Sequence, residues 1–433
     1  MFRNRRTTLV VVLLSTISCI FLAVWVYNMP FVQDRIGWRI SQLRANIKYA
    51  LSPPEDAIFT PNPTVAAMVQ ATLDAYTPTA LPVTPTATIE NHPTATITPT
   101  ATASPTPIPE SVQLGGITHE YQKWNNCGPA NLSMALSYWG WNGDQRDTAA
   151  ILKPNQRDKN VMPSEMAAFV NEHTGLTAIV RVGGDLELLK RFIAAGFPVI
   201  IEKGFEGSGF SGWMGHYEVI NGYDDSRERF TVQDSYIMPD LPVPYDDMET
   251  YWQHFNYTYI VIYPPSGENA VMEILGPDAD ETYNVEHAAE IAAGEIYAAD
   301  KREQFFAWFN RGANLVHLQD YADAAAAYDN AFQVYAEIDP EETNLPWRIM
   351  WYMTGAYWAY YYTGRYYDVL NLADVTLNAI SEQVLEESFY WRALAKEALG
   401  DTSGAINDLH TALSAHPDWE PALYQLDRLG AAP

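Results

Sequence analysis

The sequence predicts an α+β domain followed by an all-α domain of helical repeats, attached to a single N-terminal transmembrane helix. Three observations support this prediction. An uncharged apolar run follows the basic N-terminus, residues 111–265 change from helical to strand-like hydrophobic patterns, and residues 266–433 carry a helical pattern that repeats.

Length and charge limit the classes of function. The 433 residues are too many for one ordinary domain, so we expect at least two folded units. The net charge is -27, although the first fifty residues hold seven Lys or Arg and one acid, Asp34. A strongly acidic chain repels phosphate backbones, so we expect no nucleic acid partner. The two cysteines are Cys19, inside the apolar run, and Cys127, so we expect no disulfide between them.

Residues 1–28 have the pattern of an uncleaved signal anchor. The basic MFRNRR precedes an uncharged run from Thr7 to Tyr27, which is long enough to cross a bilayer. The positive-inside rule then predicts a single-pass protein of the cell membrane, with a cytoplasmic N-terminus and the bulk of the chain outside. The alternative is a lipoprotein signal ending at Cys19, but Thr16 replaces the expected leucine and the apolar run continues beyond the cysteine.

Residues 29–110 are predicted to connect the anchor to the folded units. Residues 29–50 place Trp, Ile, Leu and Arg at helical spacing, which predicts a juxtamembrane helix. Residues 51–110 are rich in Pro, Thr and Ala, a composition that cannot bury a core and that favours extended polyproline conformations. We therefore expect a disordered stalk there.

Residues 111–265 predict the α+β domain. Residues 163–175 and 185–196 have amphipathic helical patterns, and the second is closed by Gly196. The later segments FPVIIEKG, HYEVINGY, RFTVQDSY and YTYIVIYPP are typical of strands. Helices followed by successive strands indicate an antiparallel sheet.

Residues 266–433 predict paired helices, and two segments resemble tetratricopeptide repeats. The first segment has Trp308, Gly312, Tyr321, Ala324, Tyr328 and Ala331 at that spacing, and the second has Ala393, Gly400, Ala405, Ala412 and Pro417. A middle copy fits less well, because Gly355 and Gly364 are too far apart. Its many tyrosines are expected to pack between helices, with a peptide-binding groove as the alternative. The repeats predict a protein partner.

Cys127 is the candidate nucleophile. It lies where a loop runs into the apolar helix CGPANLSMALSYWG, with Pro129 at a position in the first turn that tolerates proline. The positive end of the helix dipole stabilises a thiolate there and lowers the thiol pKa. The alternative is a buried, inert cysteine.

A histidine base and an acid are expected on a neighbouring hairpin. Of the nine histidines, four lie within residues 111–265: His119, His173, His216 and His254. His216 begins the strand HYEVINGY, and reflection across a turn centred near residue 225 predicts that Asp234 comes opposite or next to it. The acid would fix the tautomer of the imidazole and stabilise the imidazolium.

Gln122 lies five positions before Cys127 and is the candidate oxyanion donor. Its side-chain amide and the backbone N–H of Cys127 would both point at the developing oxyanion. The alternative is a solvent-facing glutamine. The sequence shows no metal cluster, phosphate loop or dinucleotide motif, so we expect no metal and no cofactor.

The motifs QKWNNCGPA, GHYEVINGY and VQDSY resemble those of the double-glycine-leader (bacteriocin-processing) peptidases and their wider papain-like relatives. The resemblance covers residues 111–265 and implies a papain-like peptidase domain, with the family's nucleophile, base, orienting acid and oxyanion glutamine at Cys127, His216, Asp234 and Gln122. The spacing from Gln122 to Cys127 is one residue shorter than in many members. The transporter membrane domain and nucleotide-binding motifs of the exporters are missing, so the resemblance does not imply leader cleavage coupled to export.

These observations predict a membrane-anchored, extracytoplasmic cysteine peptidase that acts on a peptide or protein substrate, with the helical repeats docking a substrate or partner. Two alternatives stay open. One is an inactive peptidase-like scaffold that acts through its repeats, and the other is an amide hydrolase or acyltransferase of the same fold.

Overall fold

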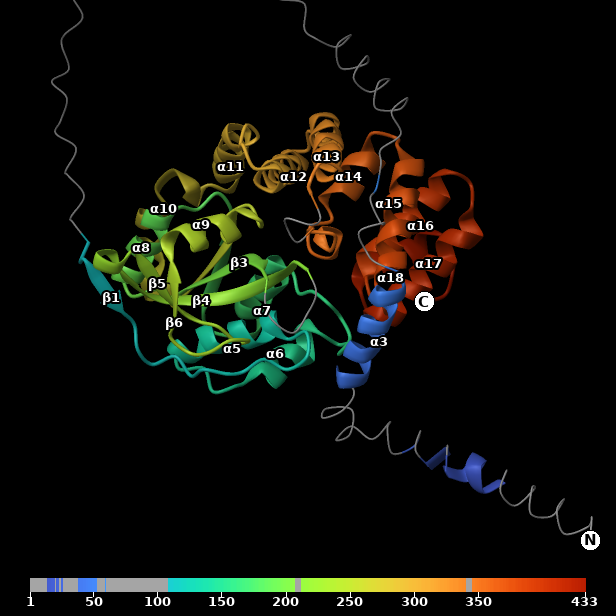
Figure 1. Ribbon diagram of the computed structural model, residues 1–433, viewed down its shortest axis with the longest axis horizontal. Helices are drawn as coiled ribbons and strands as arrows, with labels where there is room; N and C mark the ends of the chain where they lie inside the picture. The colour runs from blue at the N-terminus through green and yellow to red at the C-terminus, as the bar shows by residue number, and fades with distance from the viewer. Residues whose placement is uncertain are drawn as a thin grey trace, which may run out of the picture. The chain divides into compact units, whose positions relative to one another are not determined.

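The computed structural model describes residues 14–19, 21, 22, 25, 38–52, 59, 108–206, 212–339 and 345–433 (Figure 1). Within this part of the chain, none of the helices combines the length and the apolar character that crossing a bilayer requires. The predicted anchor between Thr7 and Tyr27 lies mostly outside the described residues, and the predicted stalk at 51–110 almost entirely so.

The chain divides into two compact units. The first combines residues 1–57 with residues 378–383, and the second contains the rest. In the first unit, α3 (Trp38–Leu51) lies in the region of the predicted juxtamembrane helix. Lys48 Nζ donates to Asn378 O at 2.5 Å and also to Ile380 O, so a lysine ammonium joins the two segments of this unit.

The described strands of the second unit form one antiparallel sheet. They are β1 (Ser111–Gln113), β2 (Thr177–Arg181), β3 (Val199–Phe205), β4 (Met214–Asp224), β5 (Arg229–Gln233), β6 (Leu241–Pro244) and β7 (Tyr259–Tyr263). Their order is β2-β7-β3-β4-β5-β6, and β1 pairs with the last residues of β4. The predicted antiparallel sheet is confirmed. The strands β1, β2 and β6 were not predicted; β6 carries two prolines, which argue against a strand in the sequence.

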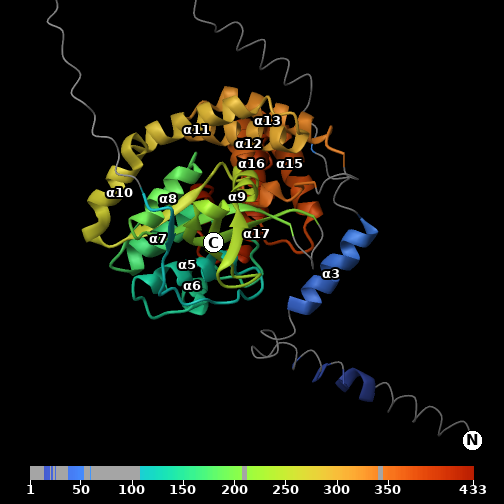
Figure 2. The same ribbon diagram turned by 60° about the vertical axis from the view of Figure 1, so that its left-hand side comes forward.

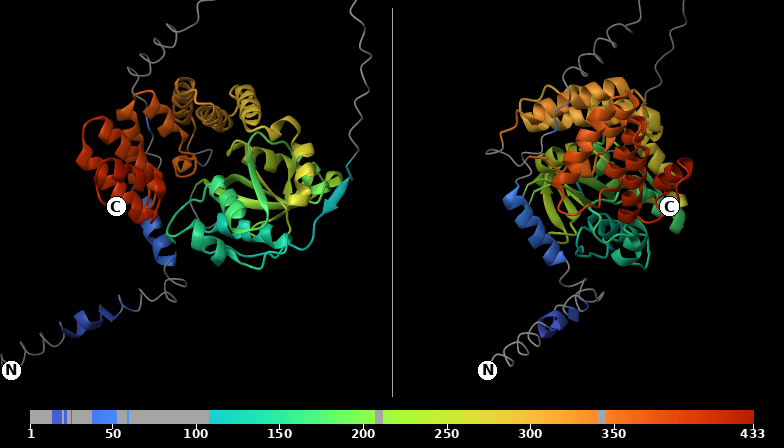
Figure 3. Two further views of the ribbon diagram at one scale, coloured as in Figure 1. Left: turned by 180° about the vertical axis from the view of Figure 1, so that it is seen from behind. Right: turned by 90° about the vertical axis from the view of Figure 1, so that its right-hand side faces the viewer.

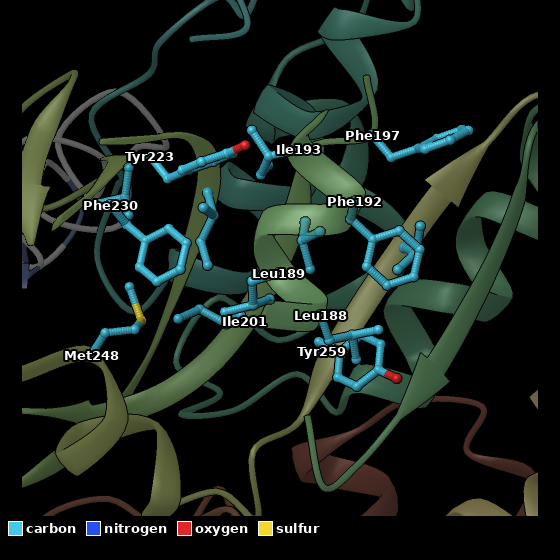
Figure 4. Close-up of a cluster of buried hydrophobic side chains, with 14 of the residues drawn as sticks. Leu188, Leu189, Phe192, Ile193, Phe197, Ile201, Tyr223, Phe230, Met248 and Tyr259 are labelled. Carbon is cyan, nitrogen blue, oxygen red and sulfur yellow. The ribbon is translucent and has the colours of Figure 1, made fainter. Parts of the chain in front are cut away.

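Helices cover both faces of this sheet. They are α5 (Cys127–Tyr138), α6 (Gln145–Leu152), α7 (Pro163–His173), α8 (Leu186–Ala194) and α9 (Tyr245–Gln253). Figure 1 shows α5 and α6 on one side of β3 and β4, and α8 and α9 on the other. Because strand side chains alternate, Ile200 of β3 packs into the core beneath α5 and α7, whereas Val199 and Ile201 pack beneath α8. Figure 4 shows the second core, where Leu189 and Phe192 of α8 lie against Ile201 and Tyr259.

The sequence explains where several helices begin. The Asp185 carboxylate accepts a hydrogen bond from Leu188 N at 2.6 Å and caps α8, and Asp144 forms a capping box with Asp147 at the start of α6. Proline is the first residue of α7. The helix α5 has no side-chain cap, so its first N–H groups remain available near Cys127.

The chain after β7 is helical, as the sequence predicted. Its α-helices are α10 (Glu268–Leu275), α11 (Glu281–Glu295), α12 (Lys301–His317), α13 (Tyr321–Tyr335), α14 (Gly355–Tyr362), α15 (Tyr366–Ala379), α16 (Glu386–Ala398), α17 (Thr402–Ala415) and α18 (Glu420–Arg428). We call this part the helical region. Consecutive helices pack together, as in α12 with α13 and α16 with α17 (Figures 2 and 3). A Cβ at Gly312 would lie 2.8 Å from the ring of Tyr328, so only glycine permits this helix contact. The tetratricopeptide assignment itself stays a prediction.

Within the second unit, α12 holds the segment between α9 and β7. The side chains of Asn256 and Asn314 hydrogen-bond to each other at 2.7 Å, and Asn310 Nδ2 donates to Gln253 O at 2.7 Å. The ring of Phe306 stacks on His254 with centroids 3.8 Å apart. Buried amides must find partners, so the helical region satisfies polar groups of the α+β domain that would otherwise be unpaired.

Phe59, inside the predicted stalk, is buried in the helical region. Its ring lies 5.0 Å from that of Phe332 on α13 and 5.8 Å from that of Tyr360 on α14. The side chain of Phe59 is only 4% exposed, whereas the side chains of a stalk are expected to be solvated. The chain therefore contacts the helical region before the Pro/Thr-rich segment continues.

Candidate active site

The fold places Cys127 beside His216, 89 positions later in the chain. Cys127 is the first residue of α5 and is half-buried. Burial tends to raise its pKa, but a hydrogen bond and the charge of His216, together with the charge of Lys153 and the backbone N–H of Tyr217, lower that pKa overall. A thiolate is thus favoured in the position that the sequence predicted for a nucleophile.

The contact between α5 and β4 depends on the early end of β5. The ladder between β4 and β5 ends at the pair Val219–Gln233, which leaves the backbone of Tyr217 without a partner from β5. Asn131 of α5 fills this position, and its Nδ2 donates to Tyr217 O at 2.7 Å and to Cys127 O at 2.9 Å. Because Asn131 is fully buried, it fixes the start of α5 on the end of β4.

Asp234 lies directly behind His216. The distance from His216 Nε2 to Asp234 Oδ1 is 3.3 Å, and both side chains are buried. Oδ1 also accepts hydrogen bonds from Tyr236 N at 2.6 Å and Ile237 N at 2.7 Å. Burial opposes ionisation of Asp234, but His216 and these backbone donors hold its pKa well below the usual range. Burial likewise opposes the charged form of His216, yet Asp234 and Cys127 raise its pKa to about 10.

The hairpin register differs from the expected one. The turn is a 3₁₀ segment at Asp225–Arg227 followed by Glu228 at φ 48°, so its centre lies beyond residue 225. The register also shifts between Ile220 and Gly222. Continued by one pair, the ladder sets Asp234 opposite Glu218, two positions from His216 on the same face, and the side chain reaches His216 diagonally.

Gln122 is held with its amide in one orientation. Gln122 N donates to Ser235 O at 2.7 Å, and its Oε1 accepts from Ser235 Oγ at 2.8 Å. Ser235 Oγ in turn accepts from Asn131 Nδ2 at 3.0 Å. With Oε1 engaged, the Nε2 group of Gln122 has no protein acceptor among the described residues. It therefore remains available as a donor, which is the requirement for an oxyanion contact.

Three charged residues near the site were missed by sequence reasoning. Lys153 is buried and donates to Asn125 O at 2.6 Å, and burial lowers its pKa to about 8. Glu202 is buried in the sheet, and burial raises its pKa well above its usual value, which favours the neutral acid. Glu218 lies 2.8 Å from Lys203 Nζ. Glu218 lies within the segment GHYEVINGY, but that segment gives no sign that its acid comes close to Asp234. A lysine after a helix likewise gives no local signal that it will face a distant cysteine.

One group in the described part of the chain has donor atoms close enough to hold a metal ion. His216, Glu218 and Asp234 bring one ligand atom each within 4.8 Å of the others. The ammonium of Lys203 already supplies a positive charge at Glu218, so a divalent cation would have to displace it. The sequence spacing gave no indication of this group, because only the sheet brings its members together.

The other candidate histidines have different surroundings. His119 Nε2 lies 3.0 Å from Asp234 O, on the backbone side of the acid. His173 packs beside Phe169 at the end of α7. His254 is buried, accepts a hydrogen bond from Trp213 Nε1 at 3.0 Å, and has a pKa well below its usual value because of burial. The described contacts therefore single out His216 as the histidine that meets Cys127.

The helical region contributes a wall next to His216. A Cβ at Gly215, the preceding residue, would lie 3.0 Å from the ring of Tyr352 and 2.7 Å from that of Phe255. Arg348 Nη1 donates to Trp213 O at 2.7 Å. Tyr352 and Arg348 come from the segment between α13 and α14, and no sequence pattern connected them to the site.

Comparisons with known proteins agree with this domain assignment. The family described as Peptidase_C39 like matches residues 110–260. Among solved structures, a proposed C39-like peptidase from Bacillus anthracis has 19% identity and TM-score 0.30, covering 35% of this chain and 96% of that chain. A double glycine motif protease of a transporter, solved with a leader peptide, has 17% identity and TM-score 0.28, covering 35% and 94%.

The peptidase domain of Streptococcus ComA, a bi-functional ABC transporter, has 14% identity and TM-score 0.28, and the match covers 35% of this chain and 99% of that chain. The comparison with curated proteins gives no match. Residues 110–260 of this chain are therefore a Peptidase_C39-like domain.

Proposed function

We propose that the chain is a membrane-anchored, extracytoplasmic cysteine peptidase that hydrolyses peptide bonds. The observation that carries the proposal is the contact of Cys127 at the start of α5 with His216, which Asp234 backs at 3.3 Å. Gln122, with its Oε1 engaged by Ser235, supports the same conclusion because no acceptor in the described part of the chain competes for its amide donor.

The residues allow a balanced two-step reaction. The Cys127 thiolate attacks the substrate carbonyl carbon and a C–S bond forms, while the oxyanion accepts hydrogen bonds from Gln122 Nε2 and Cys127 N. Collapse breaks the C–N bond, and His216 gives its proton to the leaving amine. Water then attacks the thioester, His216 takes its proton, and the C–S bond breaks to release the acid and restore the ion pair.

Two alternatives within the same fold are distinguished by this geometry or by experiment. An inactive scaffold would have no need for a thiolate, and a buried ion pair is expensive to maintain without a role. The lowered pKa of Cys127 therefore favours an enzyme. An amide hydrolase or acyltransferase would use the same residues, so only its substrate separates it from a peptidase.

The membrane location and the docking role are part of the proposal. The apolar run after MFRNRR supports an anchor with the folded units outside the cell. Tyr352 and Arg348 support a role for the helical region in substrate binding, because they contact the residues that precede His216. Peptide or protein substrates are proposed because residues 110–260 match the family described as Peptidase_C39 like.

A thiol-directed peptide probe tests the proposal on the full chain. We expect the probe to modify Cys127 and a peptide library to be cleaved, with both activities lost in Cys127→Ala. Labelling without cleavage of any peptide would favour the amide hydrolase, and a Cys127 that alkylates slowly and takes no probe would favour the scaffold. Protease added to intact cells should release both folded units if the orientation is as proposed.

A further inference from the structure

The helical region contains an aromatic pocket that shares no residue with the candidate active site. Its volume is about 540 Å³, and it lies among α14, α16 and α18. Six aromatic side chains line it: Trp358, Tyr361, Tyr362, Tyr390, Trp391 and Trp419. Their rings contact one another, as in Trp358 with Trp391 at 4.8 Å and Tyr390 with Trp419 at 5.4 Å.

Helix packing does not account for two of these rings, those of Trp358 and Tyr362. On α14, Tyr357 and Tyr360 are fully buried and pack in the interior. By contrast, Trp358 is 39% exposed and Tyr362 is 53% exposed. These two exposed rings stack on each other at 5.9 Å. Large aromatic rings gathered at an open pocket are typical of binding sites, because each can bury a large apolar area with little loss of side-chain entropy.

The polar groups of the pocket favour an uncharged ligand. Arg428 is paired with Glu397, so the two charges offset each other. Burial and the neighbouring Glu386 raise the pKa of Glu387 well above its usual value, which favours a neutral acid. A neutral carboxyl and tyrosine hydroxyls can donate hydrogen bonds to carbonyl groups. Aromatic grooves with such donors are the usual receptors of polyproline segments.

A segment of that composition lies next to the pocket in the chain. Residues 60–107 contain nine prolines, many threonines, no Lys or Arg, and two acids, Asp74 and Glu90. The segment begins directly after Phe59, which packs on Tyr360 of α14, the helix that also carries Trp358, Tyr361 and Tyr362. It therefore starts on one of the pocket's own helices.

The far end of the segment is held by the same compact unit. Tyr223 Oη donates to Pro109 O at 2.6 Å, and β1 begins at Ser111. At about 3.1 Å per residue, the residues of the segment could span on the order of 150 Å. This span is far longer than any of the helices that line the pocket. A ligand tied at both ends has an effective concentration of about millimolar, so weak contacts suffice for binding.

We propose that the aromatic pocket binds the Pro/Thr-rich segment 60–107 of the same chain. Prolines stack on Trp358 and Tyr362, and the hydroxyl groups at the pocket donate to the segment's carbonyls. The segment then acts as a strap folded back on the helical region and gives less reach than an extended stalk. This inference is independent of the proposed catalytic function.

A synthetic peptide of residues 77–107 tests the pocket directly. It is added to full-length chain in which residues 77–107 are replaced by a Gly/Ser sequence of equal length, and tryptophan fluorescence is followed. We expect saturable binding that weakens about tenfold in Trp358→Ala and in Tyr362→Ala, because each variant removes a ring on which a proline stacks. Tyr367→Ala, on a more exposed tyrosine of α15 outside the pocket, should bind normally.

Three outcomes would overturn the proposal. They are no saturable binding, equal binding of a peptide with every proline changed to alanine, and tighter binding of a lysine-rich peptide, which would indicate a cation site. A second measurement uses the unmodified chain. Proteinase K should cut within residues 60–107 faster in Trp358→Ala than in Tyr367→Ala, and equal rates in two variants of unchanged melting temperature would also contradict the strap.

Discussion

At the scale of single residues, the chemistry of the site depends on which group holds the shared proton between Cys127 and His216. The pKa of Cys127 is lowered and that of His216 is raised to about 10, so the thiolate–imidazolium pair exists between those two values. Burial alone would favour neutral partners; Asp234 and Cys127 raise the pKa of His216 against it, and His216 with Lys153 lowers that of Cys127.

The first prediction follows from these pKa values. The alkylation rate of Cys127 by iodoacetamide should stay high across neutral pH and fall only as the pH drops through the lowered thiol pKa, below the value of about 8.5 of a free thiol. His216→Ala should move the midpoint up to or above the free-thiol value. Peptide hydrolysis should also decline as the pH rises through about 10, where His216 loses the proton it gives to the leaving amine. A wild-type alkylation midpoint at 8.5 or higher would contradict the ion pair.

The second prediction concerns Ser235, which acts through Gln122. Gln122→Ala should lower kcat roughly 100-fold if its amide contacts the oxyanion. Ser235→Ala removes one hydrogen bond that orients this amide and should lower kcat by about 5- to 10-fold, the equivalent of about 1–1.5 kcal/mol. The double variant should be no slower than Gln122→Ala alone. Additive losses in the double variant would mean that Ser235 has a separate role.

The third prediction concerns Glu218 as a positioning residue behind Asp234. Burial raises the pKa of Glu218, and the interaction of its carboxyl group with Asp234 helps to lower the pKa of Asp234. Glu218→Gln keeps a donor and should retain the wild-type pH profile of alkylation, whereas Glu218→Ala should raise the alkylation midpoint and lower the melting temperature, since Lys203 loses its partner. Equal midpoints in both variants would limit Glu218 to a structural role.

At the scale of elements, the decisive feature is the packing of α5 on the end of β4. The strand β5 stops at Gln233, and Asn131 replaces it as the hydrogen-bond partner of Tyr217. The same side chain reaches Ser235, which orients Gln122. One amide thus joins the helix of the candidate nucleophile, the strand of the candidate base and the candidate oxyanion donor.

The fourth prediction tests this joint with a matched control. Asn131→Ala leaves Tyr217 O buried without a partner, so we expect a loss of about 1–3 kcal/mol in unfolding free energy and a slower alkylation of Cys127. Asn171→Ala removes comparable side-chain-to-backbone hydrogen bonds between α7 and β2, away from the site. It should lower stability but leave alkylation unchanged. Thermal unfolding and iodoacetamide rates measure both, and a normal rate in a folded Asn131→Ala would refute the joint.

At the scale of the whole second unit, the helical region and the Peptidase_C39-like domain share buried contacts. The pair Asn256–Asn314, the hydrogen bond from Asn310 and the stack of Phe306 on His254 all fall between α12 and the segment before β7. Such contacts are polar and buried, which couples the stability of the two parts.

The fifth prediction is that these parts unfold together. Calorimetry of the full chain should show the helical region and the Peptidase_C39-like domain in a single transition. Asn314→Ala should lower its midpoint, because Asn256 loses its buried partner at a cost of about 1–3 kcal/mol. The control Asn330→Ala changes an exposed asparagine of α13 and should have little effect. Two separate transitions, with only the later helices affected by Asn314→Ala, would contradict this coupling.

Much of the fold could be predicted because its signals are local. Short strand-like runs predicted β3 and β4, amphipathic spacing predicted α7 and α8, and the regular spacing after residue 265 predicted the helical region. The strands β1, β2 and β6 were not recognised. The hairpin turn was placed too early, because a 3₁₀ turn and a register shift near Asn221 add residues that a simple reflection omits.

The sequence alone determined that Cys127 begins a helix, that His216 and Asp234 flank one hairpin, and that a basic, apolar N-terminus precedes a Pro/Thr-rich segment. These features depend on neighbours a few positions apart, which set backbone propensity and amphipathic spacing. Tertiary structure alone decided that His216, and not His119, His173 or His254, meets Cys127.

The tertiary structure also decided which distant side chains support the site, namely Asn131, Ser235, Lys153 and Glu218. It likewise decided that six aromatic rings converge on one pocket. Those contacts join residues up to about a hundred positions apart. They exist because packing on the sheet places the ends of strands and helices together, and no local pattern encodes which distant side chain will complete a buried hydrogen bond.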